Sequence, residues 1–184
     1  MNTILGLDAR LSQRLRVAEK PGPRRSLAVF LAHSGDSWFW GAALIFVWLF
    51  SDSFWKQWAI MVLSAISVLA ALVMGMKFSI RRRRPEGDWG SIYRNTDPHS
   101  FPSGHAARAV LIAVLASGLG PAGLAVALWA WAPLVSLARV AMGVHYVSDV
   151  VAGFFIGIMV GIAAFQIHDQ FLLWLSSLIR YPLW

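Results

Sequence analysis

Residues 57–76 read QWAIMVLSAISVLAALVMGM, twenty positions without a charged side chain. A helix needs about 20 mainly apolar residues to cross the hydrocarbon core of a bilayer. This stretch therefore predicts a transmembrane helix. Further apolar runs predict four more crossings, at about residues 36–54, 103–120, 122–137 and 145–167. Together they predict an all-α fold, a polytopic membrane bundle of about five transmembrane helices.

The composition is typical of a membrane protein. Hydrophobic residues make up 58% of the chain and charged residues 14%, whereas about a quarter of the residues of a soluble protein are charged. The formal net charge is +7, which favours contact with anionic headgroups. We expect the bilayer and a lipid substrate as partners, and no nucleic acid. The absence of cysteine excludes disulfides, thiolate metal ligands and cysteine nucleophiles.

Both ends of the chain predict helices at the membrane surface. Within residues 3–20, Leu7, Leu11 and Leu15 recur at steps of four while arginines take other positions, and Pro21 ends the pattern. We expect an amphipathic, interfacial arm over residues 1–25, or else a disordered basic tail, followed by a single membrane-embedded domain over residues 26–184. Residues 171–184 are apolar and could form a short interfacial helix.

Five crossings would place three polar stretches on one side of the membrane: the arm, the loop over residues 77–100, and the turn over residues 139–145. Lys77 and Arg84 are seven residues apart, close to two helical turns, so they can share a face. The sequence Phe101-Pro-Ser-Gly-His105 opens a helix, and the free N–H groups of a helix start can bind an anion.

The third polar group lies before and within the last crossing. Arg139 precedes His145 by six residues, and Asp149 follows His145 by four. On a helix this spacing lets Asp149 hold one imidazole nitrogen. Each group alone has an ordinary explanation: Arg81–Arg84 as the positive flank of a membrane helix, His105 as a buried structural histidine, Asp149 as a complement to the helix dipole. Ionisable groups gathered in so apolar a chain instead indicate function.

The residue types fit the binding of a phosphate group. Lys77, Arg84 and Arg139 would neutralise a dianionic phosphate. The backbone near Ser103 and Gly104, with the Ser103 hydroxyl, would complete the cradle.

The two histidines fit the transfer of that phosphate. One histidine, held by Asp149, would attack phosphorus, and the other would protonate the leaving alkoxide and then activate water. The surrounding cations would repel a divalent ion, so we expect neither a metal nor a cofactor.

These three stretches resemble the motifs of the type 2 phosphatidic acid phosphatases, relatives of the vanadium haloperoxidases. The family motifs are Lys-x6-Arg-Pro, Pro-Ser-Gly-His and Ser-Arg-x5-His-x3-Asp, and the matching residues here run from Lys77 to Asp149. The resemblance implies that His145 is the nucleophile, Asp149 its orienting partner and His105 the acid and base. It assigns phosphate binding to Lys77, Arg84, Ser103, Gly104 and Arg139.

The resemblance implies an integral membrane lipid phosphatase that hydrolyses a lipid phosphomonoester or diphosphate through a phosphohistidine. The chain departs from the third motif at Ala138, where the family has Ser. This change removes a hydrogen bond to phosphate worth about 1–3 kcal/mol if it is made to a charged group. Arg83, His99 and Arg108 are candidates for contacts with the headgroup.

The side of the membrane follows from the distribution of basic residues. The arm adds arginines to the side of the site, which predicts a cytoplasmic active site in an inner or plasma membrane. A cytoplasmic site favours a phosphatidate, a phosphatidylglycerol phosphate or a phosphorylated polyprenyl-linked sugar, and an external site a polyprenyl diphosphate. Two alternatives remain: a lipid phosphotransferase with an acceptor other than water, and a non-catalytic phospholipid-binding membrane protein.

Overall fold

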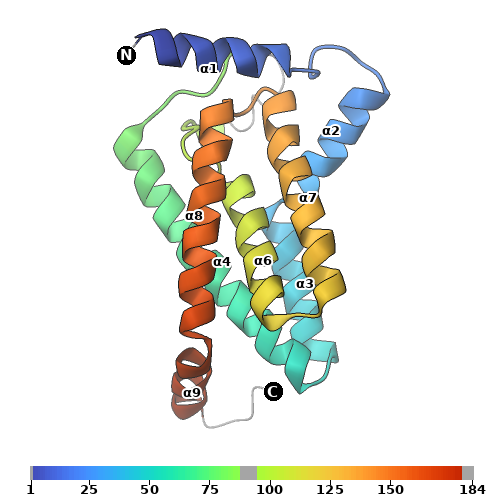
Figure 1. Cartoon of the computed structure of the whole chain (residues 1–184), viewed down its shortest axis with the longest axis vertical. Coiled ribbons are helices and arrows are strands. Elements are labelled where there is room, and N and C mark those ends of the chain that lie inside the picture. The colour runs from blue at the N-terminus through green and yellow to red at the C-terminus, as the bar shows by residue number, and fades with distance from the viewer. Residues whose placement is uncertain (1, 88–94, 180–184) are drawn as a thin grey trace.

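The computed structural model describes residues 2–87 and 95–179, and these residues form a bundle of helices (Figure 1). In chain order the helices are α1 (Asn2–Arg14), α2 (Pro23–Ser34), α3 (Ser37–Phe50), α4 (Ser53–Ile80), α6 (Gly104–Leu119), α7 (Ala122–Ala141), α8 (Val147–Gln166) and α9 (His168–Leu178). The all-α prediction is confirmed.

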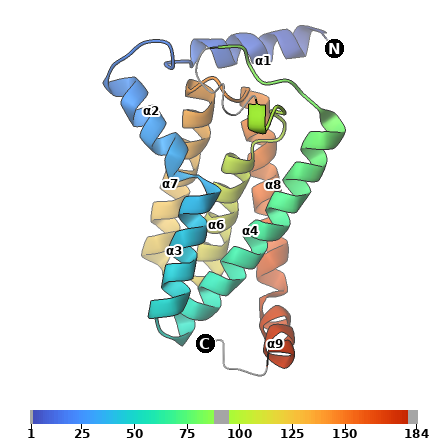
Figure 2. The same ribbon diagram turned by 180° about the vertical axis from the view of Figure 1, so that it is seen from behind.

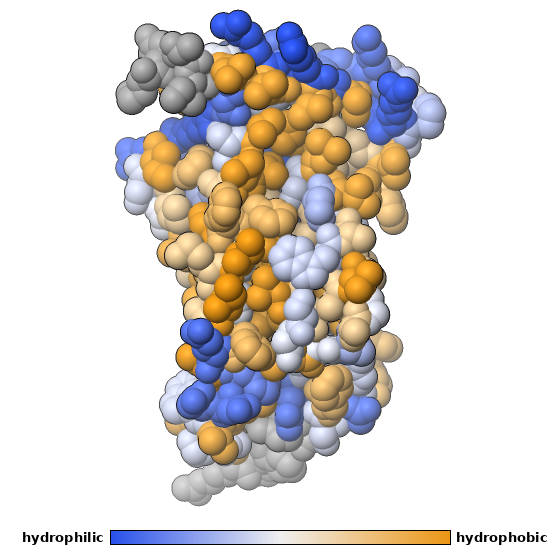
Figure 3. All heavy atoms as spheres, in the orientation of Figure 1, coloured by the Kyte–Doolittle hydropathy of each residue, from blue (hydrophilic) through white to orange (hydrophobic). Residues whose placement is uncertain are grey.

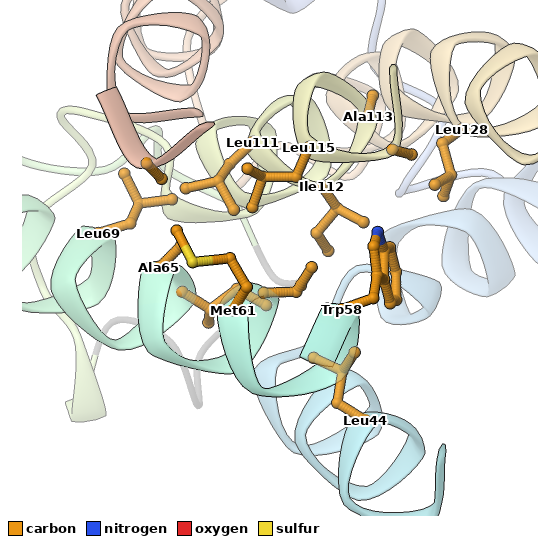
Figure 4. Packing of buried hydrophobic residues seen from close by; sticks show 14 of the residues in the cluster. Leu44, Trp58, Met61, Ala65, Leu69, Leu111, Ile112, Ala113, Leu115 and Leu128 are labelled. Carbon is orange, nitrogen blue, oxygen red and sulfur yellow. The ribbon is translucent and has the colours of Figure 1, made fainter. Parts of the chain in front are cut away.

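Helix α6 lies at the centre of the bundle, surrounded by α4, α7 and α8 (Figures 1 and 2). Most of its residues are apolar and buried, and its charged side chain, Arg108, lies near its start. Leu111, Ile112 and Leu115 of α6 are fully buried and pack toward Met61 and Leu69 of α4 (Figure 4). The core therefore forms between α6 and the helices around it.

Three helices, α4, α7 and α8, are long and apolar enough to cross a bilayer, and α3 and α6 are shorter apolar helices. These five correspond to the five predicted crossings. On the face shown in Figure 3, hydrophobic residues predominate in the middle, and the most hydrophilic residues gather toward the two ends. The chain is an integral membrane protein.

The predicted first crossing, residues 36–54, is divided in the structure. Helix α3 starts at Ser37 and has 14 residues, a length of about 21 Å. It is preceded by the separate helix α2, which the sequence analysis did not predict. The helical path is interrupted at Gly35, where a Cβ atom would lie 2.8 Å from Val135 Cγ1. Close packing against α7 therefore favours glycine at this corner.

Three other boundaries differ from the prediction. Helix α1 ends at Arg14 rather than near residue 20, because the following segment turns inward: Val17 N–H donates to Ala141 O at 2.9 Å and Ala18 is buried. Helix α7 continues to Ala141, so Arg139 lies in its last turn and not in a connecting turn. Helix α8 begins only at Val147, so His145 lies before the helix and does not share its surface with Asp149.

Helix α8 packs closely on α6 through glycines at every fourth residue. A Cβ atom at Gly153 or Gly157 would overlap the backbone oxygen of Ser103 or Ala107, and one at Gly161 would lie 2.9 Å from Val114. Small residues at this spacing let two membrane helices approach closely. The approach fixes the start of α8 beside the start of α6.

We predict that Gly157→Ala destabilises the protein by about 1–3 kcal/mol, because the added methyl group must push α8 away from α6. Gly75→Ala on α4 is the matched control, since nothing lies within 4 Å of its Cβ position. Alanine there should be neutral or slightly stabilising. Thermal unfolding in detergent, followed by the fluorescence of the ten tryptophans, measures both variants, and equal midpoints would contradict this packing.

Candidate active site

The three polar groups predicted from the sequence meet at one end of the bundle. A cavity of about 160 Å³ there is lined by residues of all three groups, namely Lys77, Arg84, Gly104, His105, Arg139 and His145. They come from the last turn of α4, the loop after it, the start of α6, the last turn of α7 and the loop before α8. These six residues, up to 68 positions apart in the sequence, thus share one cavity.

Three cations of this cavity are buried: Lys77 is 5% exposed, Arg84 6% and Arg139 1%. The carboxylate of Asp97 contacts the ammonium of Lys77 and accepts from Arg84 Nη2 at 2.8 Å. The spacing of the motifs did not indicate that Asp97 pairs with these cations. Gathering like charges away from water is costly without a counter-anion, so the cavity suits an anionic ligand.

The start of α6 adds uncharged donors to the same place. Ser103 is the N-cap of α6 and is fully buried, and its hydroxyl has no hydrogen-bond partner among the described residues. The first N–H groups of a helix also lack partners within it. A buried free hydroxyl beside free N–H groups is the arrangement that an oxyanion would complete.

His145 is 1% exposed, and its two ring nitrogens have different neighbours. Nε2 lies 3.2 Å from Arg84 Nη1. Because a guanidinium can only donate, we assign the lone pair to Nε2 and the proton to Nδ1. Nδ1 lies 3.5 Å from Asp149 Oδ2. Burial lowers the pKa of His145 to about 3, so its imidazole is neutral with a lone pair at Nε2.

The carboxylate of Asp149 is fully buried and held on both oxygens. Oδ2 accepts from Tyr146 N–H at 2.8 Å, and Oδ1 accepts from Arg82 Nη1 at 2.7 Å. Arg82 also donates to Asp8 of α1 at 2.7 Å. Neither contact of Arg82 could be expected from the sequence, because both join residues more than 60 positions apart.

His105 also has a carboxylate partner. Its Nε2 lies 2.7 Å from Asp36 Oδ1, at the corner between α2 and α3. Asp36 precedes His105 by 69 residues, and no motif joins the two. The structure therefore gives each histidine of the cavity its own aspartate.

The three predicted headgroup residues lie in different surroundings. Arg108 lines the cavity, and its guanidinium binds Gly35 O and Ser37 Oγ. Arg83 lines a second, larger cavity of about 690 Å³ that shares Arg84 and His145 with the first. His99 pairs with Arg83 in an isolated antiparallel bridge.

Ala138 is the residue at which the chain departs from the third motif. Ala138 is buried in a cluster with Ala28 and Ala32 of α2. A side chain at this position therefore faces α2. Within residues 2–87 and 95–179, no group of three or more His, Cys, Asp or Glu side chains is placed to hold a metal ion.

Known proteins resemble this chain in sequence and in fold. The model of the PAP2 superfamily matches residues 62–172. A lipid A 1-phosphatase of Porphyromonas gingivalis is 31% identical over 120 residues, which are 62% of this chain and 25% of that protein. An undecaprenyl-diphosphatase of Sulfolobus acidocaldarius is 29% identical over 155 residues, 78% of this chain and 70% of that protein. This chain thus spans about a quarter of the first relative and more than two thirds of the second.

A solved structure shares the fold. The transmembrane PAP2-type phosphatidylglycerolphosphate phosphatase of Bacillus subtilis superposes with a TM-score of 0.72 at 23% identity, over 92% of this chain and 88% of that chain. At this identity the likeness concerns the fold.

The pKa of His145 predicts a pH dependence of stability. Between pH about 3 and the ordinary histidine pKa of 6.5, the unfolded chain binds a proton that the folded chain does not. Stability must therefore fall as the pH falls below about 6.5. From pH 7 to pH 5 we expect the wild type to lose about 2 kcal/mol more than His145→Gln, at about 1.4 kcal/mol per pH unit.

The free energy of unfolding in detergent, determined for the wild type and His145→Gln at pH 7 and pH 5, measures this difference. His168→Gln, at the opposite end of the bundle, is the control and should follow the wild type. The assignment of a buried, neutral imidazole fails if His145→Gln and the wild type lose the same stability.

Proposed function

Because this chain belongs to the PAP2 superfamily, we propose that it is a metal-independent membrane phosphatase that hydrolyses a lipid phosphate through a phosphohistidine at His145. One observation carries the proposal: a buried, neutral His145 offers a lone pair at Nε2 in a cavity lined by three cations. The three cations supply the neutralisation of phosphate charge that a divalent metal supplies in other enzymes.

The first step is the transfer of phosphate to His145. Lys77, Arg84 and Arg139 bind the non-bridging oxygens, and Arg84 exchanges its contact with His145 Nε2 for one with the substrate. Nε2 then attacks phosphorus, the bond to the leaving oxygen breaks, and His105 gives that oxygen a proton. The Nδ1–H group of His145 faces Asp149, which stabilises the positive charge that develops on the ring.

The second step releases phosphate. His105, now neutral, takes a proton from a water molecule, which attacks phosphorus as the N–P bond breaks. The electron pair returns to His145 Nε2, and both histidines regain their starting states. The free hydroxyl of Ser103 and the N–H groups at the start of α6 bind the equatorial oxygens in both steps.

The walls of the cavity favour a lipid as the substrate. One side is formed by an apolar face of α4, from Ile66 through Leu69, Ala70 and Val73 to Met74. These residues extend from the cations toward the middle of a helix that is long enough to cross the bilayer. An amphipathic phosphate can therefore place its charge among the cations and its chain along α4.

Within this class we propose a phosphatidate, a phosphatidylglycerol phosphate or a polyprenyl-linked phosphate, with modest selectivity. Lipid phosphotransfer to an acceptor other than water uses the same intermediate and is the second candidate. If the protein kept the phosphate on His145 and released none in the absence of an acceptor, the result would favour the phosphotransferase. A non-catalytic phospholipid-binding protein would bind these lipids without turnover.

The surface of α1 supports an arm at the membrane interface. Asp8 and Ser12 are buried against the start of α8, where they accept from Ser148 N–H and Val147 N–H, both at 3.0 Å. Leu7, on another face of the helix, is 56% exposed. The exposed leucines suit the headgroup boundary, where an amphipathic helix buries its apolar face.

The proposed reaction is tested by phosphate release from a panel of lipid phosphates in detergent with excess chelator. We expect the wild type to release phosphate and His145→Ala to lose at least about a thousandfold of the rate. His168→Ala is the control and should keep full activity. A brief reaction with labelled substrate should leave an acid-labile, alkali-stable label on the wild type only. Activity that depends on added metal, or that survives in His145→Ala, would contradict the mechanism.

The cytoplasmic orientation of the site is tested by single cysteines, because the natural sequence has none. Arg14→Cys marks the end with the site, where the arm concentrates positive charge, and Asp169→Cys marks the opposite end, in α9 (Figure 1). In intact cells a membrane-impermeant maleimide should label Asp169→Cys, and it should label Arg14→Cys only after permeabilisation. The reverse pattern would place the site outside.

A further inference from the structure

We propose that Asp36 positions His105 for proton transfer to the leaving group, an inference that rests on the proposed function. Asp36 Oδ1 lies 2.7 Å from His105 Nε2. The side chains of both residues are largely buried, at 15% and 17% exposed. Asp36 thereby does for His105 what Asp149 does for His145, on the other side of the cavity.

The corner that carries Asp36 is fixed by side chains from α6 and α7. The guanidinium of Arg108 on α6 binds Gly35 O and donates to Ser37 Oγ at 2.5 Å. Trp131 on α7 donates to Ser34 Oγ at 2.9 Å. These contacts hold the residues on both sides of Asp36. The carboxylate is therefore presented to His105 by a rigid frame.

An aspartate at the start of a helix usually has a simpler explanation, which is helix capping. Asp36 is the N-cap residue of α3, but its side chain makes no capping hydrogen bond. Its oxygens instead face His105, His33 Nδ1 at 2.9 Å and Trp38 Nε1 at 3.3 Å. Capping of α3 does not account for this carboxylate.

The orientation of the imidazole determines which nitrogen can reach the substrate. A Cβ atom built on Gly35 would lie 3.3 Å from His105 Cδ2, so the Cδ2–Nε2 edge of the ring faces the corner. Nδ1 lies on the other edge and is the nitrogen left for the substrate. His105 also lines the cavity with the three cations.

The proton transfers then balance without a change at Asp36. In the first step the Nδ1–H bond breaks as the leaving oxygen takes the proton. In the second step Nδ1 takes a proton from the attacking water. The Nε2–H group donates to the Asp36 carboxylate throughout, which fixes the tautomer and stabilises the protonated ring.

The test compares substrates whose leaving groups differ in their need for a proton. An alkoxide from short-chain phosphatidate must be protonated, whereas nitrophenolate from p-nitrophenyl phosphate is a far weaker base. The constant kcat/KM reports the steps up to the phosphohistidine, in which His105 acts as the acid. We expect Asp36→Ala to lower kcat/KM about 10- to 100-fold for phosphatidate and less than about threefold for p-nitrophenyl phosphate.

Two further variants separate positioning from general support of the fold. In a His105→Ala background, adding Asp36→Ala should lower kcat/KM for phosphatidate by a further factor of less than about two, because the two residues act as a unit. Asp52→Ala, which removes the carboxylate that caps α4 by accepting from Trp55 N–H at 3.1 Å, should leave the ratio of the two substrates unchanged. If Asp36→Ala does not fold in detergent, the isosteric Asp36→Asn gives the same comparison.

Equal losses on both substrates, or additive losses in the double variant, would overturn the role of Asp36 while leaving the proposed function intact. A wild-type protein that hydrolyses neither substrate, nor any lipid of the panel, would instead overturn the proposed function.

Discussion

The burial of Lys77, Arg84 and Arg139 in one cavity is the constraint on which the rest of the structure depends. Removing a cation from water costs several kcal/mol unless an anion or a hydrogen-bond network compensates. Asp97 compensates part of this cost by contacting Lys77 and Arg84. The bundle must hold these groups rigidly in spite of their repulsion, and the energy to do so comes from apolar packing elsewhere. The position of α6 is therefore as much a part of the site as the charges are.

The length of α6 explains where the cavity forms. With 16 residues, α6 is shorter than the neighbouring helices α4, α7 and α8, and it starts below the ends of α7 and α8 that carry the site (Figure 1). The cavity at this end is lined by α4, the loop after it, the start of α6, Arg139 of α7 and His145. Gly153 and Gly157 bring α8 against the same end of α6. Gly104 and His105 at the start of α6 thus line the same cavity as His145.

The sequence was sufficient to predict the helical membrane fold and the motif residues that line the cavity, because apolar runs and motif spacings are local signals. It could not supply the partners that hold those residues. Asp36 reaches His105, and Arg82 reaches Asp149, only through tertiary packing. Spacing was also misleading for His145 and Asp149. Their separation of four suggested one helix face, but His145 precedes α8 and meets Asp149 from the loop.

The two histidines differ in their surroundings, and this difference is what a two-step transfer requires. His145 Nε2 accepts from Arg84, a contact that favours the neutral ring and leaves a lone pair at the nitrogen nearest the cations. His105 Nε2 faces the carboxylate of Asp36, a contact that favours a ring able to carry a proton. A nucleophile must be unprotonated and a general acid protonated at the same pH. Both rings face an aspartate, and they differ in the neighbour of Nε2, which is the guanidinium of Arg84 for His145 and the carboxylate of Asp36 for His105.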